Sequence, residues 1–99
     1  MKTIIFHPAV EEDVEAAAAW YDGQKPGLGR EFRFELQLAL TRIAQNPQLY
    51  GVELGKYRAC PLRPFSYTVY YIDREEDIWL AAVAHQKRRA GYWKHRRPE

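Results

Sequence analysis

The stretch FSYTVYYIDREEDIWLAAVAHQKRRAGYWKHRR, residues 65–97, decides the fold of this chain. Residues 65–72 alternate between two faces, which is typical of a β-strand in a sheet. The charged turn DREED joins them to residues 78–85, which are apolar on both faces, as in a strand that is covered on each side or lies centrally in a sheet. The sequence therefore predicts an antiparallel hairpin followed by a basic and aromatic tail. Any chemistry is expected at the end of the second strand and in the tail.

Two helices are expected upstream of this hairpin. After a first strand over Thr3–Phe6, Pro8 and the acidic residues that follow it predict a helix from about residue 9 to 22. The alanine run 16–19 indicates close packing against a second helix, which follows a Gly- and Pro-containing loop and runs to about residue 46. This second helix has two apolar edges, which could bury against the sheet and the first helix. The second edge consists of Phe34 and Leu38.

One further strand is expected before the hairpin. Residues 46–55 are predicted to form a loop from their Asn, Pro and Gly content, and Lys56–Cys60 then alternates as a strand that continues towards Pro61. The last three strands should form an antiparallel meander. The predicted fold class is α+β, with the order β-α-α-β-β-β and a helical hairpin packed on a small antiparallel sheet. A chain of this length predicts a single domain over residues 1–99.

Composition excludes several classes of protein. With 46% hydrophobic and 28% charged residues, the chain can bury enough apolar surface to fold. Residues 1–8 are too short for the core of a signal peptide, and no run approaches the roughly 18 apolar residues of a membrane span. We therefore expect a cytoplasmic protein with no membrane partner. Cys60 is the single cysteine, so no internal disulfide can form. No metal-ligand spacing, phosphate loop or dinucleotide fingerprint occurs, so no metal or cofactor is expected.

Charge is distributed unevenly along the chain. Residues 1–53 contain five Lys or Arg and eight Asp or Glu, whereas residues 54–99 contain ten and five. No acidic residue lies between Ala84 and Pro98, so sequence neighbours do not neutralise the basic tail. This asymmetry favours an anionic partner, either nucleic acid or an acidic protein segment. The alternative is a solvated basic tail without a partner.

His85 is the strongest candidate for acid–base chemistry. It ends the most apolar strand and precedes the basic residues 87–89. A strand end can hold the ring rigidly beside solvent, and nearby cations favour the neutral imidazole that acts as a base. In the alternative interpretation, His85 only caps the strand through a hydrogen bond. His7 and His95 are weaker candidates.

Basic and aromatic side chains of the strands and tail could gather on one concave face. Arginine and lysine both suit a phosphodiester, and Tyr92 and Trp93 could stack on a base. In the alternative interpretation, Trp93 docks the tail onto the sheet. The candidate target- or phosphate-binding residues are Lys56, Arg58, Arg63, Arg89, Trp93 and Arg96.

The order of elements, the run FSYTVYYI, the strand end AVAHQ and the closing RRAGYWKHRR resemble the RelE/ParE superfamily. These proteins are toxins of bacterial type II toxin–antitoxin modules. The resemblance spans nearly the whole chain and implies a compact toxin that a cognate antitoxin neutralises by wrapping over it. The basic half of the chain suits an acidic segment in such a partner.

RelE-like members of this superfamily are ribosome-dependent endoribonucleases that cleave mRNA without a metal. For this chain, that branch would imply an acid or base at His85 or Tyr92. Basic side chains would stabilise the pentacoordinate phosphate. The residues implied for that electrostatic role are Arg88, Lys56, Arg58 and Arg63.

ParE-like members share the fold but poison DNA gyrase and have no RNA-cleaving site. Where RelE-like toxins carry an arginine in a strand, this chain has Thr68, and its strand end AVAHQ is closer to ParE-like sequences. The resemblance therefore favours a gyrase-poisoning toxin, which would not be an enzyme. The first alternative is a RelE-like mRNA interferase that acts on the ribosome with mRNA. The second is a non-toxic small nucleic-acid-binding module.

Overall fold

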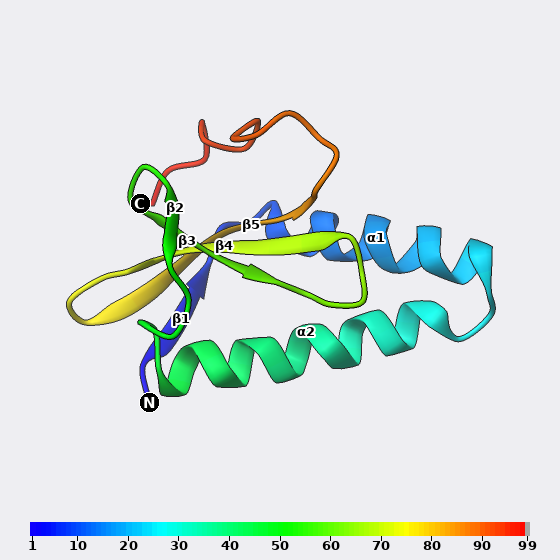
Figure 1. The fold of residues 1–99 in the computed structure, drawn as a ribbon, viewed down its shortest axis with the longest axis horizontal. Coiled ribbons are helices and arrows are strands. Elements are labelled where there is room, and N and C mark those ends of the chain that lie inside the picture. Colours follow the sequence, from blue (N-terminus) through cyan, green and yellow to red (C-terminus); the bar gives the residue numbers. More distant parts are fainter. Residues whose placement is uncertain (99) are drawn as a thin grey trace.

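Two helices pack as a hairpin on one face of a five-stranded sheet in the computed structural model, which describes residues 1–98 (Figure 1). The elements are β1 (Thr3–Phe6), α1 (Val10–Gln24), α2 (Leu28–Gln45), β2 (Val52–Leu54), β3 (Tyr57–Pro61), β4 (Tyr67–Asp73) and β5 (Asp77–His85). The strand order in the sheet is β1-β5-β4-β3-β2. The expected α+β class and helical hairpin are confirmed.

Strand β5 lies centrally in the sheet. It is antiparallel to β4 and parallel to β1, and its residues 78–84 are all buried. Both the central position and the predicted meander of the later strands are confirmed. The sheet is mixed, however, and not wholly antiparallel. After β1, the helical hairpin carries the chain to the opposite edge of the sheet, where β2 lies. The later strands then run back across the sheet, so that β5 lies beside β1 and parallel to it.

Strand β2 is an addition to the predicted order. Residues 46–55 were expected to be a loop, but Val52–Leu54 pair with the start of β3. The two-residue turn Gly55–Lys56 reverses the chain, and Gly55 has φ 59°, a value that glycine adopts without strain. A three-residue edge strand exists only through pairing with its neighbour. Local composition therefore does not reveal it.

The main core lies between the helices and the sheet. Phe32 and Leu36 of α2 pack there with Leu80 of β5. Phe34 and Leu38 were expected to form a second buried edge of α2, but they are 63% and 39% exposed, so that expectation is wrong. Two residues along a helix correspond to a rotation of about 200°, which turns Phe34 away from the side that carries Phe32. No helix in residues 1–98 is long and apolar enough to cross a membrane.

The two helices are in close contact at Gly29, as the alanine run predicted. A Cβ atom at this position would overlap the backbone oxygen of Ala18 and would lie 2.8 Å from the carboxylate of Asp22. Asp22 Oδ1 also accepts a hydrogen bond from the Gly29 amide at 2.8 Å. This bond satisfies one of the amides that the first turn of a helix leaves free.

Residues 86–98, here called the tail, cover the other face of the sheet. Figure 1 shows the tail, in orange to red, on the side of the sheet away from α2. Trp93 of the tail joins a second core cluster with Tyr57 and Trp79 of the sheet. The sheet is therefore covered by helices on one face and by the tail on the other.

Candidate functional site

His85 ends β5 opposite the first residue of β4, Tyr67. The two rings meet edge to face, with centroids 5.0 Å apart and planes at 85°. The amide of Lys87 donates to His85 Nδ1 at 3.0 Å. His85 thus forms the capping hydrogen bond that the structural interpretation expected. Nε2 is the ring nitrogen that remains for a ligand.

Residues 86–92, here called the basic loop, follow His85 as a series of tight turns. The amide of Arg88 donates to the carbonyl of His85 at 3.1 Å, and the amide of Tyr92 donates to the carbonyl of Arg89 at 3.2 Å. Arg88 and Arg89 are both exposed. The Arg88 guanidinium carbon lies 3.9 Å from the centroid of the Tyr92 ring, a cation–π contact that orients its charge.

His85, Arg88 and Tyr92, the residues expected to act in RNA cleavage, line the same small cavity. Its volume is about 50 Å³. A water molecule takes up about 30 Å³ in the liquid, so this cavity has room for water and not for a nucleotide. A partner would therefore meet the exposed surface of the basic loop.

Thr68 lies beside this cavity and is buried, with 6% of its surface exposed. The side-chain Nε2 of Gln86 donates a hydrogen bond to the Thr68 hydroxyl at 3.4 Å, and the backbone amide of Gln86 donates one to the carbonyl of Ser66 at 2.9 Å. Thr68, which the resemblance set against the RelE-like arginine, is thus a neutral side chain under the start of the basic loop. It supplies no charge to stabilise a phosphorane.

Trp93 anchors the tail on the sheet. Its side chain is 1% exposed, its ring stacks on Tyr70 at 4.7 Å and 30°, and it meets Tyr57 edge to face at 4.7 Å. This is the docking role that the alternative interpretation gave to Trp93. A ring with both neighbours in place presents no free face to a base.

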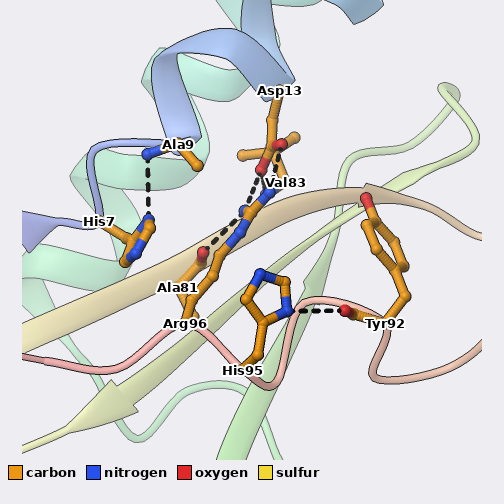
Figure 2. A network of polar contacts seen from close by, with 8 residues as sticks. All are labelled: His7, Ala9, Asp13, Ala81, Val83, Tyr92, His95 and Arg96. Atoms are coloured by element: carbon orange, nitrogen blue, oxygen red, sulfur yellow. Dashed lines mark hydrogen bonds and ion pairs between the residues drawn. The ribbon is translucent and has the colours of Figure 1, made fainter.

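Arg96 is held inside the molecule by Asp13 of α1 (Figure 2). Its Nη1 and Nη2 donate to Asp13 Oδ2 and Oδ1 at 2.7 and 3.0 Å, and Nη1 also donates to the carbonyl of Ala81 at 3.1 Å. Both side chains are 10% exposed. The hydrogen bonds to Asp13 raise the pKa of Arg96 above its ordinary value. In this arrangement Arg96, expected to bind phosphate, offers no free guanidinium to a ligand.

The Asp13–Arg96 pair, here called the clasp, covers the part of β5 that lies beyond the end of β1. Pairing with β1 stops at Leu80. Farther along, the carbonyl of Ala81 accepts from Arg96, and the amide of Val83 donates to Asp13 Oδ2 at 3.1 Å. A register shift places Ala81 as an extra residue opposite β4. Two side chains thereby take the hydrogen-bonding places of an adjacent strand.

His7 and His95 make local hydrogen bonds (Figure 2). His7 Nδ1 accepts from the amide of Ala9 at 3.0 Å, at the start of α1. His95 Nδ1 lies 3.2 Å from the carbonyl of Tyr92, to which it can only donate. Both rings therefore hold turns in place.

Of the three candidate binding residues before the tail, only Arg63 lies at the His85 end of the sheet. It follows Leu62, whose amide bonds to the carbonyl of Tyr67, the partner of His85. Arg58 pairs with Tyr71, four residues farther along β4, and its Nη1 donates to the carbonyl of Tyr50 at 2.7 Å. Lys56 lies in the turn beyond Arg58. The structure thus does not gather Lys56 and Arg58 around the basic loop.

Two residues of this region escaped the sequence analysis. Tyr67 contacts His85, and burial raises the pKa of its phenol. Asp13 holds Arg96 across 83 residues of sequence. Acidic residues in a first helical turn are already explained by the helix dipole, so Asp13 gives no separate signal. Only the strand register and the position of the tail reveal these contacts.

The described residues contain no group of three or more His, Cys, Asp or Glu side chains that could hold a metal ion. What the region presents is an exposed set of cations on a loop that Trp93 and Arg96 fasten to the sheet. Such a surface suits contact with an anionic or acidic macromolecule.

Comparisons with known proteins point to one family. Residues 4–90 match the sequence profile of the family described as "ParE toxin of type II toxin-antitoxin system, parDE". The chain is 32% identical over 80 residues to Toxin ParE2 of Mycobacterium tuberculosis, in both strain CDC 1551 / Oshkosh and strain H37Rv, which covers 80% of this chain and 76% of the relative. A solved chain of the chromosomal ParDE TA system from P. aeruginosa superposes with a TM-score of 0.75 at 13% identity. That match covers 86% of this chain and 96% of that one, and shows a shared fold.

Proposed function

This chain belongs to the family of ParE toxins of type II toxin–antitoxin systems, and we propose that it arrests growth in the cytoplasm by poisoning DNA gyrase. The proposal is supported by the ParE branch of the family, because gyrase poisoning is what the resemblance to ParE-like toxins implies. We further propose that a cognate antitoxin neutralises the chain. The solved ParDE system from P. aeruginosa, in which a similar fold occurs, supports such a partner.

The observation that carries this proposal is the character of the surface around His85. The cavity there measures about 50 Å³ and the buried neighbour Thr68 is neutral, so the region lacks both a substrate-sized pocket and the RelE-like cation. Arg88 and Arg89 are exposed on a loop that is fixed to the sheet. Such an arrangement suits binding to another macromolecule better than catalysis in a cleft.

The test is a supercoiling assay with purified gyrase and purified toxin. The chain should inhibit supercoiling, and the double variant Arg88→Gln/Arg89→Gln should inhibit at least about 10-fold more weakly, since charge complementarity at an interface is lost. The matched control is Arg30→Gln/Arg33→Gln, which removes two exposed cations from α2. Normal supercoiling at a toxin concentration that stops growth would exclude gyrase as the target.

A second candidate function is ribosome-dependent cleavage of mRNA, which the meeting of His85, Arg88 and Tyr92 at one cavity favours. This function predicts codon-phased cuts in translated messages during growth arrest. His85→Ala and Arg88→Ala should abolish the cuts in proteins that keep their fold, because they remove the acid–base group and the phosphate-facing charge. Intact messages in arrested cells would rule this candidate out.

A further inference from the structure

We propose that Asp13 and Arg96 are positioning residues for growth inhibition, because the clasp that they form holds the basic loop in the arrangement that meets the target. This inference rests on the proposed function as a growth-arresting toxin. It assigns a role to a helix residue, Asp13, that lies far from the basic loop in sequence and binds the tail through Arg96.

The tail has few attachments to the rest of the protein. Its turns are closed by bonds between near neighbours, such as Lys94 N to Gly91 O at 2.9 Å and Arg96 N to Trp93 O at 2.9 Å. Bonds of this range shape the loop but cannot fix it on the sheet. In the described part of the chain beyond Gln86, the only tail side chain that hydrogen-bonds outside the tail and the adjoining strand end is that of Arg96. The other attachments are the packing of Trp93 and, at the start of the tail, the hydrogen bonds of Gln86 to the Thr68 hydroxyl and to the Ser66 carbonyl.

The cations of the tail fall into two kinds. Arg96 is 10% exposed at its side chain and paired with Asp13. The other tail cations are exposed, and within residues 1–98 none of them forms an ion pair with an acidic residue. They are Lys87, Arg88, Arg89, Lys94 and Arg97. Arg96 is therefore placed to orient the exposed charges, while the exposed charges are placed to bind.

A carboxylate and a guanidinium suit this role by their geometry. Asp13 accepts three hydrogen bonds, two from the guanidinium fork and one from the Val83 amide of β5. The planar fork of arginine fixes the direction of the side chain as well as its distance, which a lysine would not do. The clasp thus ties α1, β5 and the tail together at one point.

The experiment compares Asp13→Asn, Arg96→Gln and the double variant with the unmodified chain. Three quantities are measured for each protein: amide hydrogen exchange of residues 86–97 and of β4, arrest of growth on induction, and inhibition of gyrase supercoiling. The matched control is Glu15→Gln, which removes another exposed acidic charge from α1. Arg96→Gln changes a residue of the tail and none of the helices or strands. It therefore still tests the positioning role of the clasp if Asp13→Asn fails to fold.

We expect exchange in the tail to rise about 10-fold or more in each single variant while exchange in β4 stays unchanged, because charged hydrogen bonds stabilise the tail locally. The toxin level needed to arrest growth should rise by a similar factor in each single variant. The double variant should be no weaker than the weaker single variant, because Asp13 acts through Arg96. The control should match the unmodified chain in every measurement.

Other outcomes would overturn the inference. A loosened tail with full growth arrest would show that the position of the loop is irrelevant. Lost arrest with unchanged tail exchange, or additive losses in the double variant, would show that Asp13 does not act through the clasp. Growth arrest that depends on the clasp while supercoiling stays normal would refute gyrase as the target and support the positioning role. A chain that arrests no growth would overturn both proposals.

Discussion

At the scale of single residues, Gly29 sets how closely α1 and α2 can pack. The Gly29→Ala substitution should destabilise the protein by about 2 kcal/mol, because the backbone oxygen of Ala18 cannot move aside without separating the helices. Thermal unfolding should show a Tm lower by roughly 10 °C. The control is Gly23→Ala, where an added Cβ has no atom within 4 Å. It should keep or raise the Tm, and equal losses in both variants would contradict the packing argument.

Tyr71 makes stability depend on alkaline pH. Its side chain is fully buried, its hydroxyl donates to the carbonyl of Pro47 at 2.7 Å, and burial raises its pKa from 10.0 to about 12. The folded state holds this proton more tightly than the unfolded state. The contribution is therefore complete below pH 10 and is lost as the pH rises towards 12, by up to about 2 to 3 kcal/mol.

Urea unfolding of the unmodified chain and of Tyr71→Phe, at about pH 8 and about pH 11, tests this dependence. The variant should be less stable by about 1 kcal/mol at the lower pH, because the hydrogen bond to Pro47 is gone. Its stability should then fall less between the two pH values. Identical falls in the two proteins would show that the Tyr71 phenol is not the group responsible.

At the scale of elements, the tail completes the second core cluster. Trp93→Ala should cost about 3 kcal/mol, because the cavity left between Tyr57 and Tyr70 cannot close fully. It should also increase binding of a hydrophobic dye as the outer face of the sheet becomes exposed. Trp20→Ala is the control, since Trp20 is 57% exposed, and it should change stability by less than about 0.5 kcal/mol. Equal losses in the two variants would contradict an anchoring role.

The elements that the sequence predicts well are those whose signal is local. The hairpin of β4 and β5 and the two helices carry their own periodicity, so their existence and type are confirmed, with shifts of one or two residues at the ends. The short strand β2 and the parallel pairing of β1 with β5 depend on partners distant in sequence, which no local pattern encodes. The same limit applies to the clasp, because nothing near Asp13 indicates Arg96. The resemblance to the ParE branch is confirmed as family membership.

At the scale of the whole molecule, folding keeps the two charge populations apart except at the Asp13–Arg96 clasp. The acidic first half forms β1 and the helices, whereas the basic tail covers the opposite face of the sheet (Figure 1). Association with the proposed acidic antitoxin segment should therefore slow as salt rises. Arg88→Gln/Arg89→Gln should flatten this dependence more than Arg30→Gln/Arg33→Gln in stopped-flow measurements over a range of ionic strengths. Equal slopes for both double variants would show that the tail does not steer the encounter.

The central place of β5 has a consequence for how a cell makes this protein. During translation, the helical hairpin can form early from contacts within residues 10–45. Strand β1, however, is joined to strands β2–β4 only through β5, which is made after all of them. The sheet cannot close until residues 77–85 have left the ribosome. The surface that carries His85 and the basic loop is therefore assembled late, and an antitoxin already present in the cell can meet the toxin as its fold is completed.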